Sequence, residues 1–416
     1  MIARPTDVSA AASRSAQNKD ATGAYQTTWT WGIAKSVDKT KVEQVGGTAT
    51  FNYTVNVSHD SGTTSDVKVT GNIDVTNPNG TGVTMSSLTD QLSDGTTCTV
   101  TAGSTTLAPG DNNFSYSCSL SAVPSGELDN TARVNWGDQT LNDGSVLPAG
   151  SADYMFSNIS FAQNKVDDSV TVSDSYAGAL GTVSETDPSP TGFTYNRAVN
   201  VPQFGCQSYD NTATFTTNTT GTTGSDNKTV TVCGPVPTGA LTMGFWQNKN
   251  GQGIITGQAT TGTCPSGTWL RHYAPFQDLS ATATCSQVAA YVYNIIKAAN
   301  ASGAAMNALL KAQMLATALD AYFSGPGGNK IGAPGPVGNV SIDLTKVCAN
   351  PTGCTSYEDT SSAFGGNSPH TVSDLLTYAA SQSNAGGSTW YGQVKATQGL
   401  AKDTFDAINN QVAFGG

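Results

Sequence analysis

Two strand-like segments place a lysine and an asparagine on faces that otherwise carry apolar residues. In "WTWGIAKSVD", counting in twos puts Lys35 on the same face as Trp31 and Ile33. In "LDNTARVNW", the same count puts Asn130 on the face of Leu128. Burial lowers the pKa of a lysine, and the resulting neutral amine can attack an asparagine carboxamide and release ammonia. Lys35 and Asn130 are therefore a candidate pair for an intramolecular isopeptide bond.

A second candidate pair is Lys165 with Asn211. Lys165 shares its strand parity with Phe161, and Asn211 shares its parity with Ala213 in a later segment. The reaction also needs a protonated Asp or Glu beside the carboxamide, and the sequence does not identify this acid. The alternative for both pairs is that the lysine lies near a strand end and extends its ammonium to solvent, while the asparagine bonds to backbone groups.

The composition excludes several classes of protein. The 416 residues are enough for two or three domains, and only 12% of them are charged, with a net charge of -11. Nucleic-acid binding needs clustered Lys and Arg, which the chain lacks, so we expect no nucleic-acid partner. No apolar run approaches the ~20 residues of a membrane span, so we expect no membrane insertion. The G-x-S-x-G, H-E-x-x-H and P-loop patterns are absent, so we expect no catalytic turnover, cofactor or bound metal.

Eight cysteines fall into four local pairs along the chain. We expect four disulfides, because the spacings do not match a zinc site, and this indicates an oxidising, extracellular compartment. The residues 1–24 contain no apolar segment typical of a secretory signal, so we expect the export signal to be missing from this sequence. The expected pairs are Cys98 with Cys118, Cys206 with Cys233, Cys264 with Cys285, and Cys348 with Cys354.

The organisation along the chain changes near residue 240. After a flexible leader at 1–24, alternating apolar residues and Gly/Asn/Pro turns predict a β-sandwich at 25–145 and a shorter one at 150–235. The segment "FSYSCSLSAVPSGELDNTARV" reappears as "FTYNRAVNVPQFGCQSYDNTATF", which supports two related modules. Helical periodicity then predicts an all-α, loop-rich, disulfide-stapled domain at 240–416.

Helix signals within this last domain are specific. Thr284 with Gln287 forms a capping box, and Gly303 divides the following apolar pattern into two helices. A further helix is expected from Thr371, with Asp374 three residues later, and another from Ser388 to about residue 412.

Two families resemble parts of the chain. The strand ending in Lys35, the following "GGTATFNYTVNV" and the closing "DNTARV" resemble the Ig-like repeat of prokaryotic surface proteins, including the stalk modules of Gram-positive collagen adhesins. The resemblance implies a crosslink between a first-strand lysine and a last-strand asparagine, and Lys35 and Asn130 occupy the matching places. The segment "LTMGFWQNKNGQGI" is similar to the G-[FY]-W-x-N segment that opens a helical domain in secreted bacterial proteins.

Aromatic residues near the start of the helical domain could contact a ligand. Exposed Trp and Tyr rings stack on sugars or anchor protein partners, whereas buried ones would close the core of the domain. A hydrolase site is a further alternative, with His272 and Asp278 as its acid–base pair. The candidate ligand contacts are Phe245, Trp246, Trp269, His272 and Tyr273.

The sequence thus favours an extracellular bacterial surface or matrix protein with a structural or adhesive function. Its partners would be other surface proteins, further copies of itself through strand edges, or extracellular glycans. A carbohydrate-binding secreted module and a secreted hydrolase remain the two alternatives.

Overall fold

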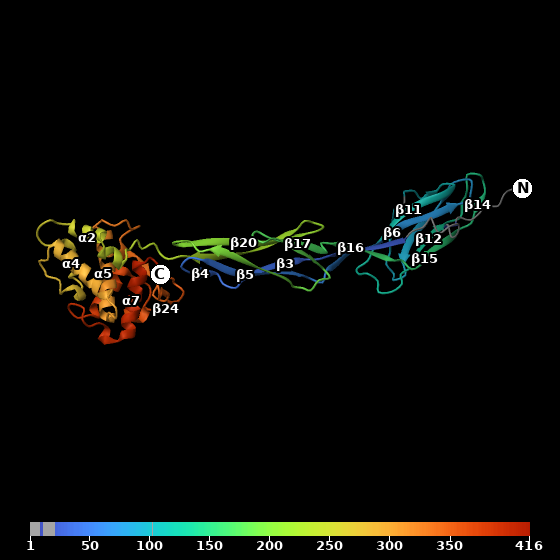
Figure 1. Cartoon of the computed structure of the whole chain (residues 1–416). Helices are drawn as coiled ribbons and strands as arrows, with labels where there is room; N and C mark the ends of the chain where they lie inside the picture. The colour runs from blue at the N-terminus through green and yellow to red at the C-terminus, as the bar shows by residue number, and fades with distance from the viewer. Residues whose placement is uncertain (1–8, 11–20, 102) are drawn as a thin grey trace. The chain divides into compact units, whose positions relative to one another are not determined.

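In a computed structural model that describes residues 9–10, 21–101 and 103–416, the chain divides into two compact units. Figure 1 labels its main helices and strands. Unit 1 comprises Met1–Ser36, Tyr53–Tyr195 and Asn211–Lys228. Unit 2 comprises Val37–Asn52, Asn196–Asp210 and Thr229–Gly416. Most of the expected leader at 1–24 lies outside the described residues. Its last four residues open strand β2 (Ala21–Thr28).

Strands dominate the described residues up to position 233. They are β1 (Ser9–Ala10), β2, β3 (Trp31–Val37), β4 (Lys41–Glu43), β5 (Thr48–His59), β6 (Thr63–Asn77), β7 (Val83–Thr84), β8 (Ser87–Leu92), β9 (Thr99–Thr101), β10 (Thr106–Leu107), β11 (Gly110–Ser119), β12 (Asn130–Trp136), β13 (Gln139–Thr140), β14 (Val146–Leu147), β15 (Gly150–Phe156), β16 (Phe161–Val166), β17 (Ser169–Asp174), β18 (Gly178–Ser184), β19 (Thr191–Asn200), β20 (Cys206–Thr217) and β21 (Thr223–Cys233).

One apolar core of unit 1 lies between the sheets β16–β2–β6–β11–β9 and β15–β12–β8. Strand β6 shows the alternation that builds it, because Val69, Ile73 and Val75 are buried while the residues between them are more exposed. The partner strand β11 contributes Phe114 and Tyr116 in the same way. Full burial of such side chains stabilises a fold by about 1.5 to 3 kcal/mol each, as an upper estimate.

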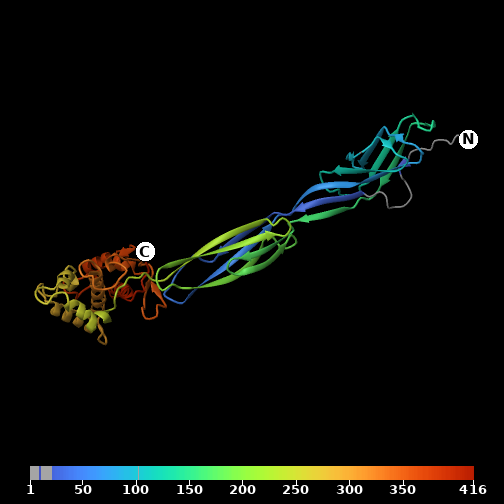
Figure 2. The ribbon, with the colours of Figure 1, turned by 90° about the horizontal axis from the view of Figure 1, so that it is seen from above.

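A second apolar core of unit 1 is filled from two further sheets. Val55 and Val57 come from β5 in the sheet β19–β5–β3, and Val170 and Val172 come from β17 in the sheet β18–β17–β20–β21–β4. Figure 2 shows the strands of this part running alongside one another. Because each strand turns alternate side chains inward, a polar residue that keeps the inward parity must also enter this core.

The strand pairing crosses the module boundary that the sequence suggests near residue 150. Strand β3, expected in the first module, shares a sheet with β19, and β12 pairs with β15, which begins at Gly150. The alternation of side chains identifies strands and their buried faces, but it does not identify which strand pairs with which. Chain segments on either side of residue 150 therefore contribute to both cores.

Helices dominate the rest of unit 2 (Figures 1 and 2). Their apolar faces form one continuous core. They are α1 (Met243–Gln247), α2 (Lys249–Thr256), α3 (Pro265–Leu270), η1 (Ala274–Phe276), α4 (Cys285–Ala299), α5 (Met306–Ser324), η2 (Val337–Asn339), η3 (Ser361–Phe364), α6 (Val372–Ser381), η4 (Tyr391–Gln393) and α7 (Lys395–Asn409).

The region after residue 240 is not purely helical. Two short antiparallel pairs join β22 (Ser341–Ile342) with β25 (His370–Thr371) and β23 (Val347–Cys348) with β24 (Tyr357–Glu358). Each strand has only two residues, which is too short for a periodic signal in the sequence.

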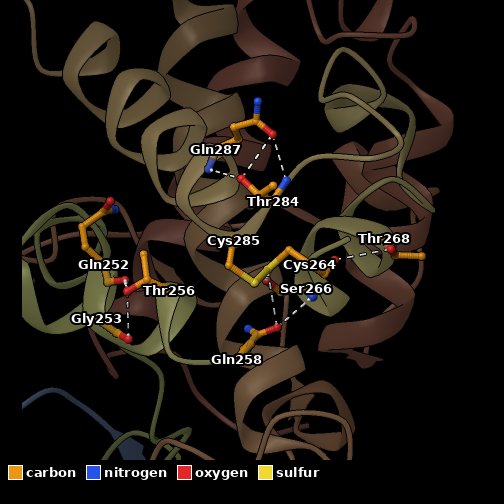
Figure 3. Close-up of a disulfide and its surroundings, with 10 residues drawn as sticks. All are labelled: Gln252, Gly253, Thr256, Gln258, Cys264, Ser266, Thr268, Thr284, Cys285 and Gln287. Atoms are coloured by element: carbon orange, nitrogen blue, oxygen red, sulfur yellow. Dashed lines mark hydrogen bonds between the residues drawn. A yellow bond between two sulfur atoms is a disulfide. The ribbon is translucent and has the colours of Figure 1, made fainter. Parts of the chain in front are cut away.

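The helix signals of the sequence are confirmed where capping residues define them. Thr284 and Gln287 form a reciprocal capping box at the start of α4, and Thr371 and Asp374 form another at the start of α6. Figure 3 shows the first box beside the disulfide between Cys264 and Cys285. Gly303 has a φ of +74° between α4 and α5, a conformation that glycine adopts without steric cost.

The G-F-W-x-N segment has a structural role in starting the helical region. Trp246 is fully buried and its indole Nε1 donates to Asp320 Oδ1 at 3.0 Å. Asn248 caps α2 by accepting from two backbone N–H groups. A Cβ at Gly251 would lie 2.6 Å from the Cα of Trp246, so only glycine lets these helices approach so closely.

Four disulfides are present, and they join the pairs that the sequence predicts. Each closes a short stretch of chain, of 6 to 27 residues. In the chain-entropy account, a disulfide stabilises a fold by about 2 to 4 kcal/mol. Among the described residues, no helix is both long and apolar enough to cross a membrane.

Replacing Asp320 with asparagine tests the protonation of its buried carboxyl. Burial raises the pKa of Asp320 well above its ordinary value, more than the bonds from Trp246 and Leu241 lower it. A raised folded pKa stabilises the fold fully below about pH 4, and this contribution is lost as the pH rises toward the folded value.

We therefore expect the opening free energy of α5 amides, measured by hydrogen exchange, to fall from about pH 4 to pH 8 relative to that of Asp320→Asn. Parallel pH profiles for the two proteins would contradict a neutral Asp320.

Candidate crosslinking site

Lys35 extends from β3 into the second core of unit 1. Its Nζ lies 2.6 Å from Asp174 Oδ2, and neither side chain has any solvent-exposed surface. Lys35 belongs to the sheet β19–β5–β3 and Asp174 to the sheet that contains β17 and β20, so the ion pair spans the core between two sheets. A buried charge is tolerated only beside a compensating one, which explains why the chain can turn this lysine inward.

Asp174 accepts four hydrogen bonds. The backbone N–H groups of Tyr176 and Ala177 donate to Oδ1, each at 2.9 Å. Lys35 Nζ and the Tyr195 hydroxyl, at 2.7 Å, both donate to Oδ2. Burial alone would raise the pKa of Asp174, but these bonds, that of Lys35 foremost, hold it below its ordinary value. The resting pair is therefore an ammonium and a carboxylate.

Asn211 lies next to this pair on β20 and is fully buried. Its Nδ2 donates to the Tyr195 hydroxyl at 2.8 Å, and its Oδ1 accepts from Ser175 Oγ at 3.0 Å. An unbroken series of hydrogen bonds thus runs from Lys35 through Asp174 and Tyr195 to Asn211. The series contains an amine, an acid and a carboxamide, which are the groups an isopeptide reaction needs.

Two tyrosine rings enclose the lysine. Lys35 Nζ lies 5.0 Å from the ring centroid of Tyr53 and 5.9 Å from that of Tyr195. The two rings stack on each other with centroids 5.3 Å apart and an interplanar angle of 13°. Both rings attract the ammonium and keep water away from it. Burial, together with the Asp174 carboxylate, raises the pKa of Tyr195, so its hydroxyl stays protonated.

The pairing of Lys35 differs from the expected pairing with Asn130. Asn130 lies on β12 and its Nδ2 donates to Asp90 Oδ2 at 3.0 Å in the first core of unit 1. Lys35 instead contacts Asp174, whose neighbour along the hydrogen bonds is Asn211. The reason is the strand pairing described above, which assigns β3 to the sheet opposite β17 and β20.

Lys165 also has a different partner from the expected Asn211. It lies on β16 with 42% of its side chain exposed, and its Nζ pairs with Glu185. Strand β16 is the edge strand of its sheet, and Lys165 extends its ammonium to solvent. The structure of Lys165 therefore matches the alternative given above, in which a lysine near a strand end extends its ammonium to solvent.

Sequence reasoning missed the acid and the tyrosine. Asp174 continues the inward parity of Val170 and Val172 in "VTVSD", so the same count that selected Lys35 would have selected it. Tyr195 occupies the third position of "FTY", where the internal repeat has Tyr116 in "FSY". Tyr116, Asp90 and Asn130 are buried in unit 1, so an acid, a tyrosine and an asparagine occur there a second time.

One candidate ligand contact of the helical region lies in its core, and three others are half-buried and pack against that core. Trp246 is fully buried, Phe245 packs edge-on against it, and Trp269 packs against Tyr273 with centroids 5.2 Å apart. Burial raises the pKa of Tyr273. Of the five, only His272 is exposed. These rings close the core of a loop-rich region.

The expected acid–base pair of a hydrolase has separate partners. His272 Nδ1 bonds to the backbone oxygen of Trp269 at 2.9 Å. Asp278 Oδ2 accepts from Lys311 at 2.8 Å, and its Oδ1 accepts from the Tyr291 hydroxyl. Asp278 thus joins α4 to α5 instead of orienting the histidine.

A different acidic cluster occurs near α7. Burial, together with the nearby Asp403, raises the pKa of Glu358. Lys402 pairs with both Asp403 and Asp406. Lys402 therefore compensates Asp403 and Asp406 in a local ion-pair network, and Glu358 lies beside the acid Asp403.

Comparisons with known proteins give no family for the chain: no protein-family model and no curated protein matches it.

Substitutions at the buried pair of Lys35 and Asp174 should reduce the free energy of unfolding more than substitutions at the pair of Lys165 and Glu185. Asp174→Ala removes the carboxylate and leaves the Lys35 amine buried, which costs about 3 to 5 kcal/mol relative to the double variant Lys35→Met/Asp174→Ala. Chemical denaturation followed by fluorescence measures the difference.

The matched control is the exposed pair of Lys165 and Glu185. Glu185→Ala and Lys165→Met/Glu185→Ala should unfold at nearly the same denaturant concentration, because a lysine that reaches solvent needs no partner and surface pairs contribute little. A single Asp174→Ala variant as stable as its double variant would contradict a charged, buried Lys35.

Proposed function

We propose that the protein is an extracellular structural or adhesive protein, in which Ig-like β-sandwich modules present a helical domain and covalent bonds hold the modules together. The observation that carries the proposal is the buried series Lys35–Asp174–Tyr195–Asn211. We assign it to an isopeptide bond between Lys35 and Asn211, with Asp174 as the acid. This replaces the pairings of Lys35 with Asn130 and of Lys165 with Asn211.

The proposed reaction balances without an added reagent. Lys35 Nζ transfers one proton to Asp174 Oδ2, and its lone pair then attacks Cγ of Asn211. As the tetrahedral intermediate collapses, the proton on Asp174 passes to Nδ2 and the Cγ–Nδ2 bond breaks with release of ammonia. A second proton then passes from Nζ to Asp174. The products are a Lys35 Nζ–Asn211 Cγ amide, ammonia and a neutral Asp174. Two charges disappear from a pair that is buried from solvent, which favours the products.

The position of the bond suits a mechanical function. Lys35 and Asn211 lie on opposing sheets of the second core of unit 1, so the bond would prevent these sheets from separating. The four disulfides tie short local segments, whereas this bond would close a loop of about 175 residues. A protein that works outside the cell, without chaperones, benefits from both kinds of restraint.

The disulfides and the composition of the chain support the proposed secretion and the proposed partners. Four disulfides fit an oxidising compartment. The low charge of the chain and its strand edges fit association with other surface proteins, extracellular glycans or further copies of the chain. The carbohydrate-binding and hydrolase alternatives have less support, because the aromatic candidates pack inward and His272 and Asp278 bond to other groups.

Intact-mass spectrometry tests the bond directly. The unreduced protein should be lighter than its sequence mass by about 8 Da for four disulfides plus about 17 Da for one ammonia. Reduction should restore only the disulfide part. Lys35→Arg and Asn211→Ala should each abolish the 17 Da loss, and Asp174→Ala should prevent or greatly slow it.

Lys165→Arg and Asn130→Ala are the matched controls, because Lys165 pairs with Glu185 and Asn130 donates to Asp90 in the first core. Peptide mapping of the wild-type protein should recover one branched peptide joining Lys35 to Asn211. Full sequence mass after reduction, or a branch at another pair, would overturn the assignment. Asn211→Ala should also be digested faster by trypsin if the bond serves stability.

A further inference from the structure

The reaction proposed above contains a proton transfer that Asp174 cannot complete alone. The nitrogen Nδ2 of Asn211 carries two hydrogens and must gain a third to leave as ammonia, because an amide anion is far too basic to depart. The acidic proton starts on Asp174 Oδ2, and Nδ2 makes its hydrogen bond to the Tyr195 hydroxyl. The structure therefore raises the question of how the proton reaches the leaving nitrogen.

We propose that the Tyr195 hydroxyl relays this proton from Asp174 to the leaving nitrogen of Asn211. The inference rests on the proposed isopeptide bond and assigns one further catalytic residue to it. The hydroxyl lies 2.7 Å from Asp174 Oδ2 and 2.8 Å from Asn211 Nδ2, so it touches both the acid and the leaving group. Tyr195 receives a proton from Asp174 and gives its own to Nδ2, so it ends unchanged. Asp174 then takes up the second proton of Lys35 Nζ and ends neutral.

The other contacts of the site leave this route open. Asp174 Oδ1 is held by two backbone N–H groups, so the proton that Lys35 releases goes to Oδ2, the oxygen that also contacts Tyr195. Ser175 Oγ donates to Asn211 Oδ1 and so polarises the carbonyl while turning Nδ2 toward the tyrosine. Each polar end of the carboxamide therefore faces a different hydroxyl.

The surroundings fix the relay in place. The ring of Tyr195 stacks on Tyr53 and packs against the second core of unit 1, so its hydroxyl has little freedom to move. Burial and the Asp174 carboxylate raise the pKa of Tyr195, which keeps a transferable proton on the oxygen. In the other repeat, the buried Tyr116 occupies the sequence position that corresponds to Tyr195.

The test compares crosslinking rates in the full chain. Unreacted protein is collected unfolded from inclusion bodies and refolded with its disulfides formed, and the 17 Da loss is followed over time by mass spectrometry. Tyr195→Phe keeps the stacked ring and removes only the hydroxyl, and we expect a rate at least about 100-fold below that of wild type. Tyr25→Phe is the matched control, because Tyr25 lies on β2, in a sheet that borders the first core of unit 1, and it should react at the wild-type rate.

A second measurement needs no variant. The wild-type rate is recorded in mixtures of H2O and D2O, where transfer of two protons through a hydroxyl gives a curved dependence on deuterium fraction and transfer of one proton gives a straight line. A curved plot and a slow Tyr195→Phe variant support the relay. A straight plot, or a Tyr195→Phe variant as fast as wild type, overturns the relay and leaves the isopeptide bond intact. Absence of the 17 Da loss in the wild type overturns the bond itself.

Discussion

The ammonium of Lys35 can lie inside a β-sheet core only because the carboxylate of Asp174 meets it there. Separately, either charge would carry a large desolvation penalty in a core formed by valines and aromatic rings. Together they form a 2.6 Å pair, and they fix which strands must face each other. The contact forms because β3 lies opposite β17 and β20, and the same arrangement places Asn211 beside the pair.

A buried ion pair is by itself a weak source of stability, because its attraction barely offsets the cost of removing two charges from water. The same pair is well placed as the starting point of a reaction that removes both charges. Asp174 would end neutral in an apolar site, and Lys35 would become part of an uncharged amide. In the chain-entropy account, closing a loop of about 175 residues would add roughly 5 kcal/mol, more than each local disulfide provides.

The fold was partly accessible from the sequence. Alternation identified the buried faces of β5 and β6, capping boxes placed the starts of α4 and α6, and proximity paired all eight cysteines. The helix expected from Ser388 begins later, as α7 at Lys395, after the one-turn η4. Signals of this kind depend only on residues that are close in sequence, so they can be recognised without knowledge of the tertiary structure.

Only part of the candidate site could be predicted from the sequence. The inward parity of Lys35 and Asn211 could be read from their own strands, and so could that of Asp174. The sequence did not predict that these three residues lie together. Long-range packing determines which strands pair, and the alternation of side chains along one strand does not reveal it. Lys165 shows that inward parity does not guarantee burial. Its parity matches that of a core residue, but β16 is an edge strand and the lysine side chain reaches water.

A high-resolution crystal structure of the wild-type protein would test the central claim most directly. The account predicts continuous electron density between Lys35 Nζ and Asn211 Cγ, at a separation of about 1.33 Å with planar amide geometry. Density that ends at a complete carboxamide, with the lysine nitrogen at hydrogen-bonding distance or beyond, would contradict it.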